Sequence, residues 1–210
     1  MKKPKMAAAF IALAFGTVLL SQSCATLDQM SAALVNLKRL QFRIGEVNDF
    51  RLAGIAIGGK TSLGHFSAME ALQLVGAFRA KNLTADFVLN VLAVNPNDGT
   101  GGSSRTVSTL TSLESRLLID GKPTVAGNIE RPLEIPGTGQ ATVIPIRLSL
   151  NLFEFFADRR YEDLVGLALA LGGANRAPTR VALDAQPSVS TPLGTIAYPG
   201  RLTIVSTEFR

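Results

Sequence analysis

The segment from Gly54 to Thr61 has the residue types and spacing of a phosphate-binding loop. Its first and last glycines are separated by four residues and followed by a lysine and a threonine. Such a loop binds phosphates through free backbone N–H groups placed directly before a helix. Here Ile55 and Ile57 alternate as strand residues do, and Gly64 would interrupt the helix. We therefore interpret the segment as a hydrophobic strand entering a Gly-Gly turn and expect no nucleotide to bind.

Other constellations that could support catalysis or metal binding are incomplete. His65 is the only histidine and lies in a glycine-containing loop, where we expect it at the surface. A single histidine cannot form a histidine metal cluster, and no nucleophile with a suitable sequence context accompanies it. Asn95, Asn97 and Asp98 offer oxygens to a cation, but the spacing of a calcium loop is absent, so a turn is expected. The sequence predicts no catalytic residue, no cofactor and no metal, and hence a protein that is not an enzyme.

Cys24, the only cysteine, follows an N-terminal segment with the features of an export signal. Three lysines precede an apolar stretch from Met6 to Leu20, which is short for a membrane-spanning helix. The small Ser23 before the cysteine fits a lipoprotein cleavage site, whereas Ser21 stands where leucine is usual. We expect residues 1–23 to be a lipoprotein signal peptide and Cys24 to be lipidated. The alternative is ordinary secretion with an incidental cysteine.

A lipid on Cys24 would hold the protein at a membrane. Each buried methylene contributes about 0.8 kcal/mol, so a diacylglyceryl group together with an amide-linked acyl chain gives stable anchoring. Ala25 follows the cysteine in place of aspartate, which favours the outer over the inner membrane of a two-membrane bacterium. We expect a location in the bacterial cell envelope, with residues 24–34 as a tether and residues 35–210 as one domain.

The charge of the chain argues against a nucleic-acid partner. The formal net charge is +5, but Lys2, Lys3 and Lys5 lie in the expected signal peptide. The remaining 18 of the 21 basic residues are nearly balanced in charge by 16 acidic residues. A nearly neutral body without a basic cluster has no electrostatic footprint for nucleic acid. At 47% hydrophobic residues the chain can also build a sizeable core.

The stretch from Phe87 to Val94 is predicted to be the central strand of the fold. Apolar residues occupy both faces of the extended chain, and Asn90 is the only polar residue among them. This pattern is typical of a strand that is covered on both sides. Pro96, flanked by two asparagines, ends the strand because it cannot donate to a sheet and its neighbours favour turns.

Alternating and helical periods predict the remaining elements. The capping pair Ser67 and Glu70 starts a helix over 68–80, with a stripe of Met69, Leu72, Val75 and Phe78. A second helix is expected over 151–172, with a kink near 158–160. Its Phe-rich face, including Phe155 and Phe156, is expected to pack on the sheets, and a ligand groove is the alternative. A hairpin is expected at Asp120–Gly121, and Pro145 indicates an edge strand or a bulge. The other strands are predicted at 36–45, 50–57, 107–119, 123–129, 142–148, 181–185 and 202–204.

Several of these segments resemble the late embryogenesis abundant type 2 family, which shares the water stress and hypersensitive response domain. The similarity runs from Leu83 to Phe209. It is carried by Asn95-Pro96-Asn97, by the proline-flanked segment 132–136, by 143–148 and by 152–156. The strand pattern and the resemblance both predict a mainly β fold, an immunoglobulin or fibronectin III-like antiparallel β-sandwich with one or two packed α-helices.

The resemblance implies a fold and a cellular role, and it implies no catalysed reaction. We expect a bacterial lipoprotein version of the family, a non-enzymatic envelope protein that protects against desiccation or other stress or acts as a binding module. The membrane would be its partner through the lipid on Cys24. The alternatives are a structural accessory of an envelope complex and a carrier of lipid or another hydrophobic ligand. An exposed apolar patch would favour binding, and an unprotected strand edge would favour docking in a complex.

Overall fold

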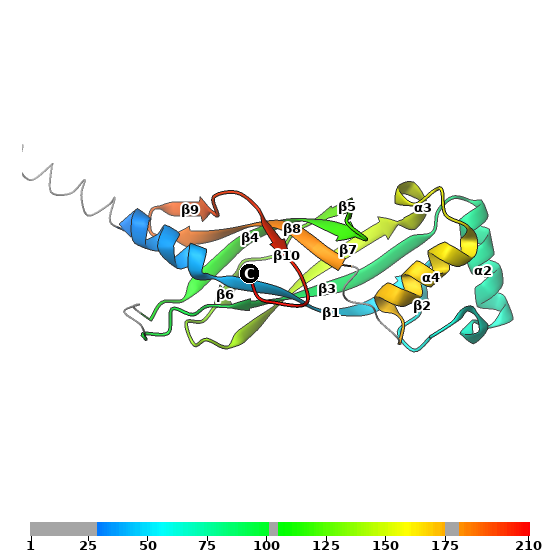
Figure 1. Ribbon diagram of the computed structural model, residues 1–210, viewed down its shortest axis with the longest axis horizontal. Helices are drawn as coiled ribbons and strands as arrows, with labels where there is room; N and C mark the ends of the chain where they lie inside the picture. The colour runs from blue at the N-terminus through cyan, green and yellow to red at the C-terminus, as the bar shows by residue number, and fades with distance from the viewer. Residues whose placement is uncertain (1–28, 101–104, 175–180) are drawn as a thin grey trace, which may run out of the picture.

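Two antiparallel sheets pack face to face in the computed structural model, which describes residues 29–100, 105–174 and 181–210 (Figure 1). The first sheet has the strand order β2 (Ile55–Ala56), β1 (Gln41–Leu52), β3 (Thr84–Val94), β7 (Ala141–Asn151). The second has the order β10 (Leu202–Ile204), β8 (Val181–Thr191), β4 (Ser108–Ile119), β5 (Lys122–Gly127). Two short strands extend it, β6 (Leu133–Ile135) on β4 and β9 (Gly194–Ala197) on β8. The predicted mainly β sandwich with packed helices is confirmed.

Strand β3 lies in the interior of the first sheet, between β1 and β7, as predicted. Phe87, Leu89 and Val91 point into the core and are buried. Val88 and Leu92, on the opposite face, are only half-buried. The prediction that both faces are covered is wrong, because the second sheet packs against one face alone.

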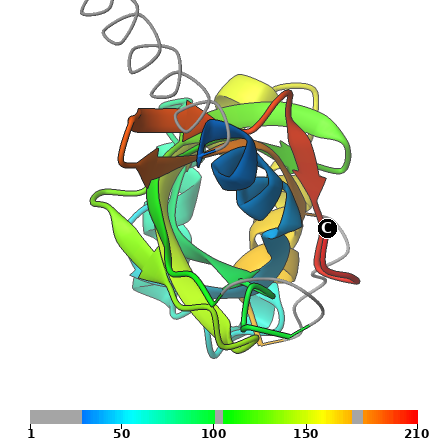
Figure 2. The same cartoon turned by 90° about the vertical axis from the view of Figure 1, so that its left-hand side faces the viewer.

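The chain before β1 is helical rather than extended. Residues 29–39 form a helix where a tether and the start of a strand were predicted, and residues 24–28 lie outside the described residues. Leu37 and Leu40 are buried, and Figure 2 shows the helix lying across one end of the sandwich. The first strand begins at Gln41 and continues to Leu52, so it also includes the start of the predicted second strand.

Helix α2 (Ala68–Arg79) begins as the sequence predicts but buries a different face. Ser67 Oγ accepts a hydrogen bond from Glu70 N at 3.3 Å, and Glu70 Oε2 accepts one from Ser67 N at 2.8 Å. The buried side chain is Leu74, whereas Met69 and Leu72 are 74% and 68% exposed. Much of the predicted apolar stripe therefore faces outward.

The predicted long helix is two separate helices, α3 (Leu152–Phe155) and α4 (Tyr161–Gly172). The chain leaves the helical path at Phe156, whose backbone lies outside the helical region, and turns before α4 begins. Phe156 and Leu164 are buried in the core, while Phe155 is half-buried. The two helices and α2 cover the end of the sandwich opposite to helix 29–39 (Figure 1).

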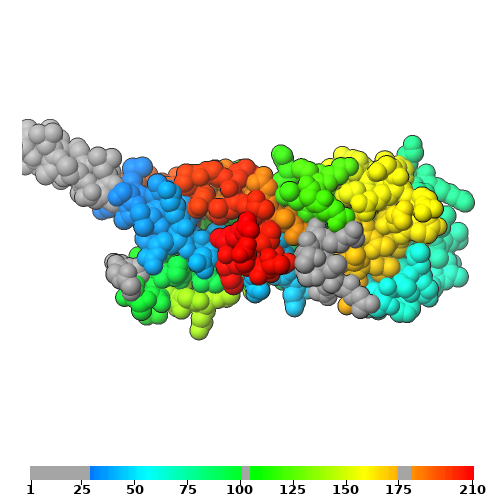
Figure 3. All heavy atoms as spheres, in the orientation of Figure 1, coloured from blue at the N-terminus to red at the C-terminus, as the bar shows by residue number. Residues whose placement is uncertain are grey.

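The long edge strands of the first sheet are protected. On β1, Phe42 N donates to Arg210 O at 2.6 Å, and Arg210 N donates to Phe42 O at 2.9 Å. Residues 205–210 therefore run beside β1, on the middle of the long face in Figure 3. On the opposite edge, β7 carries Pro145, which has no N–H to offer. The predicted edge position of Pro145 is confirmed.

The turn between β4 and β5 has the backbone conformation that the sequence predicts. Asp120 and Gly121 have φ angles of 52° and 77°, both in the left-handed region that a two-residue hairpin requires. β5 returns antiparallel to β4, as expected.

Candidate functional site

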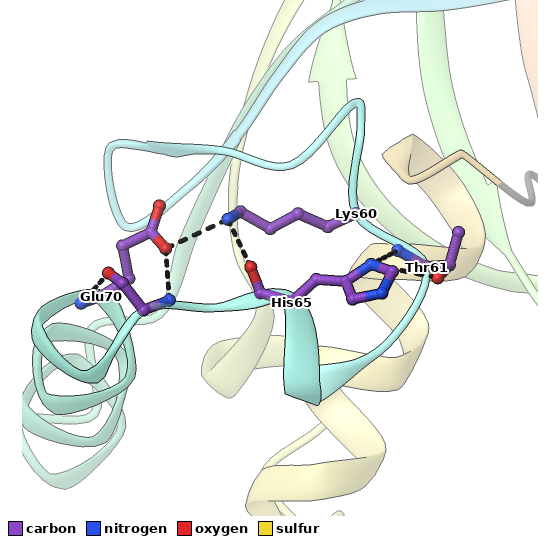
Figure 4. Close-up of polar contacts among 5 residues, drawn as sticks. Lys60, Thr61, His65 and Glu70 are labelled. Carbon is purple, nitrogen blue, oxygen red and sulfur yellow. Dashed lines mark hydrogen bonds and ion pairs between the residues drawn. The ribbon is translucent and has the colours of Figure 1, made fainter.

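Lys60 of the phosphate-loop-like segment is held by side-chain and backbone oxygens of its own chain (Figure 4). Its Nζ lies 3.0 Å from Glu70 Oε2 and 3.0 Å from the carbonyl oxygen of His65, and 4.8 Å from the centre of the Phe66 ring. The backbone N–H of Ser67 and then Lys60 lower the pKa of the Glu70 carboxyl. This cluster ties the Gly-Gly turn to the start of α2 and leaves Lys60 only 17% exposed.

The backbone of this segment does not form a phosphate cradle. Ile55 and Ile57 are buried, as expected of strand residues. The turn uses Lys60 N to donate to Ile57 O at 2.9 Å, and it is followed by the three-residue helix η1 (Leu63–His65). Phosphate binding needs a row of free backbone N–H groups that leads into a long helix. Here the turn uses its N–H group internally, and within the described residues no long helix follows it directly.

The remaining polar candidates are structural or peripheral. His65 is exposed, as predicted, and its Nδ1 accepts a hydrogen bond from Thr61 N at 3.2 Å. Within the described ranges, no three His, Cys, Asp or Glu side chains are close enough to hold a metal ion. Cys24 and the predicted signal peptide, residues 1–23, lie outside the described residues.

Asn95 and Asn97 form a buried polar junction at the end of β3. The side-chain nitrogen of Asn95 donates to the carbonyl oxygens of Thr106 at 2.9 Å and Ile135 at 3.0 Å. Its side-chain oxygen accepts from the backbone and side-chain nitrogens of Asn97 at 3.1 and 2.8 Å. The predicted turn is present, and its amides hold three chain segments together. Asp98, on the exposed side, accepts from Thr100, which lowers the pKa of its carboxyl.

The outer face of the first sheet carries a hollow of about 560 Å³ beside β7. Apolar side chains from β3, β7 and the segment before and within β6 line it, namely Val88, Ile129, Leu133, Val143 and Pro145. Val143, the third residue of β7, is 50% exposed on this face. The sequence showed that β3 has apolar residues on its second face, but we predicted that this face is buried.

A second hollow of about 360 Å³ adjoins the first, and the two share Val88 and Arg147. We call the combined depression the groove. Arg147 Nε is paired with Glu130 Oε1 at 2.8 Å, and Asp86 accepts a hydrogen bond from Ser149 at 2.6 Å. Arg131, which also lines the groove, has no ion pair within the described ranges. The groove therefore combines an apolar floor with charged walls, in which the guanidinium of Arg131 lines the first hollow and the carboxylates of Asp49 and Asp86 line the second.

The outer face of the second sheet is polar by comparison. Glu114 and Arg116 are exposed on β4, and Arg201 Nε contacts Asp184 Oδ2 of β8 at 2.8 Å. The apolar outer surface is thus a property of one sheet only. In the part of the chain that the structure describes, no helix combines the length and the apolar character needed to cross a bilayer.

Comparisons with known proteins give no family assignment. No protein-family model and no curated protein matches this chain. A late embryogenesis abundant protein solved in solution is 13% identical, with 90% of this chain and 87% of that chain covered and a TM-score of 0.34. A crystal structure of a protein from Archaeoglobus fulgidus is 9% identical, with 79% and 98% covered and a TM-score of 0.32. At these scores neither similarity assigns a family or a function, and the fold rests on the strand pairing described above.

Proposed function

We propose that this chain is a non-enzymatic, lipid-anchored protein of the bacterial cell envelope whose groove binds an acyl chain with an acidic head group. The observation that carries the proposal is the groove, where Val88, Val143 and Pro145 lie near Arg131, which forms no ion pair with the residues that the structure describes. Its two hollows have volumes in the range of ligand pockets, roughly 300–1,000 Å³. An apolar chain would cover the exposed Val143 and the half-buried Val88, and its head group would pair with the guanidinium.

This binding activity fits the stress-protective role that the sequence resemblance implies. Acyl chains that leave a damaged bilayer expose apolar surface to water and so associate with other apolar surfaces. A tethered protein that holds such chains would limit this association without catalysing a reaction. Neither the resemblance nor the groove requires a metal or an organic cofactor, and no nucleotide is part of the proposal.

The anchor is tested by replacing the lipid acceptor. In Cys24→Ser the only thiol is lost, so the variant should not incorporate a labelled fatty acid and should leave the membrane fraction or keep its signal peptide. Metabolic labelling followed by separation of inner and outer membranes measures both. Equal labelling of the variant and the wild type would disprove lipidation at Cys24. Outer-membrane fractionation of the wild type is expected.

The groove is tested by titration with a fluorescent fatty acid. Val143→Asp places a carboxylate on the apolar floor and should weaken binding about tenfold or more. Arg131→Ser should weaken binding of the fatty acid but not of its uncharged methyl ester. Leu72→Asp is the matched control, because Leu72 is 68% exposed on α2, at the far end of the molecule. Unchanged affinity in Val143→Asp, with a native thermal melt, would reject the groove as the binding site.

Docking through an edge of the first sheet, as a structural accessory of an envelope complex, has less support. Residues 205–210 run beside β1, and Pro145 interrupts the donor row of β7. A partner strand would need continuous free N–H and C=O groups. Binding of an apolar ligand is therefore the preferred function.

A further inference from the structure

Exposed apolar side chains gather at the end of the molecule that helix 29–39 covers. Four of the nine large hydrophobic side chains that are exposed among the described residues belong to this end, namely Met30, Val35, Val107 and Leu193. They come from three separate segments: the helix, the residue before β4, and the turn between β8 and β9. Figures 1 and 2 show these segments at the same end. We call these four side chains the N-terminal end surface.

The charges around this surface are mostly positive. Lys38 and Arg105 are exposed and Arg39 is half-buried, whereas Asp98 in the adjoining loop and the exposed Glu134, which is the strand partner of Thr109 two residues after Val107, are acidic. The carboxylate of Asp98 already accepts two hydrogen bonds from Thr100. Basic side chains around protruding apolar ones are suited to an interface of anionic head groups and acyl chains.

The path of the chain limits how far this end can lie from a membrane. The first described residue, Gln29, is five positions after Cys24, and an extended chain covers at most about 3.3–3.6 Å per residue. A lipid on Cys24 therefore keeps the start of helix 29–39 within roughly 18 Å of the head groups. The tether places no such limit on the opposite end, because β1 alone extends for about 40 Å along the molecule.

We infer that the N-terminal end surface rests on the lipid bilayer, with Val35, Val107 and Leu193 inserted among the head groups. This inference rests on the proposed anchor at Cys24 and adds a second contact to it. Helix 29–39 lies between the membrane and the core, since Leu37 packs inward while Val35 points outward. The domain then stands on its N-terminal end, with α2 directed away from the membrane and the groove on its flank.

Single cysteines carrying an environment-sensitive fluorophore test this orientation. Val35→Cys, Val107→Cys and Leu193→Cys are made in the full chain, processed by the cell and reconstituted in vesicles of phosphatidylethanolamine and phosphatidylglycerol. Leu72→Cys, on α2, is the matched exposed control. Brominated lipids should remove most of the fluorescence at the first three positions and leave the control unchanged.

Three results would overturn the inference. Absence of quenching at all three N-terminal positions would mean that this end does not touch lipid. Equal quenching at Leu72→Cys would mean that the domain lies flat on the bilayer. Fluorophores shielded from water but not quenched by the lipids would show that a protein covers this end. Labelling of the chain without added cysteines would reveal a free Cys24 thiol, which refutes the anchor separately from the surface contact.

Discussion

Gly172, the last residue of α4, lies directly against the ring of Phe50 in β1, and a Cβ at position 172 would overlap that ring. Phe50 in turn stacks on Phe87 of β3, with ring centroids 5.0 Å apart and an interplanar angle of 6°. The absence of a side chain at Gly172 thus allows α4 to lie close against the first sheet.

Gly172→Ala should lower the free energy of unfolding by about 1–3 kcal/mol, because the added methyl group overpacks the contact with Phe50. Gly166→Ala is the control in the same helix, since a Cβ there meets nothing within 4 Å. It should leave stability unchanged or raise it by up to about 1 kcal/mol, through the higher helix propensity of alanine. Urea denaturation measures both. Equal effects would show that α4 is not packed as described.

Leu89→Asp and Leu92→Asp should differ strongly although they lie three residues apart on β3. Leu89 is fully buried, so a carboxylate there should unfold the domain or cost several kcal/mol. Leu92 is half-buried on the outer face and should be replaced at much lower cost. Chemical denaturation of both variants would reveal whether the outer face is open. Comparable losses would mean that something covers it.

Asn95→Ala should destabilise the domain by roughly 2–4 kcal/mol, because it leaves the buried carbonyls of Thr106 and Ile135 without their donor. Thr100→Ala, in the exposed part of the same turn, should change stability by no more than about 0.5 kcal/mol. Thermal and urea melts give the comparison. A mild effect of Asn95→Ala would indicate that water replaces the lost donor.

The carboxylate of Glu70, which accepts a hydrogen bond from the backbone N–H of Ser67 and pairs with Lys60, should contribute to stability in a pH-dependent manner. The folded-state pKa of Glu70 is lowered below its ordinary value of 4.5. The contribution is therefore fully present above pH 4.5 and is lost as the pH falls through the folded-state pKa. Glu70→Gln should melt at a lower temperature than the wild type at neutral pH and at the same temperature in strong acid.

Glu134→Gln is the control for this experiment, since Glu134 is exposed and forms no ion pair within the described ranges. Its melting temperature should follow that of the wild type at every pH. A difference between Glu70→Gln and the wild type that persists in strong acid would contradict the ionic origin of the effect.

Local signals in the sequence predict elements well but not the faces that they bury. Ser67 and Glu70 define the start of α2 because their hydrogen bonds are made within one helical turn. The burial of Leu74 instead of Leu72 depends on how the whole helix docks, which periodicity alone does not determine. Helix 29–39 was missed, although Met30, Leu34 and Leu37 have helical spacing, because the alternation of Leu40 and Phe42 suggested a strand.

The candidate site was the least predictable feature. Alternating apolar residues on β3 are compatible with two covered faces or with one covered face and one groove, and only the position of the second sheet decides between them. The depth of the groove also depends on the crossing segment around Ile129 and Glu130, which no periodic pattern relates to β7. In contrast, the interpretation of Lys60 as part of a turn followed directly from its neighbours.

The reciprocal hydrogen bonds between Phe42 and Arg210 have a consequence for the order of events in folding. They join the first long strand to a segment nearly a full domain length later in the sequence, so this strand gains its second neighbour only after a very large loop has closed. Contacts of such high sequence separation are typical of slow-folding topologies. A chain that completes its first sheet so late is expected to fold slowly, and slow folding would favour the export that is proposed for it.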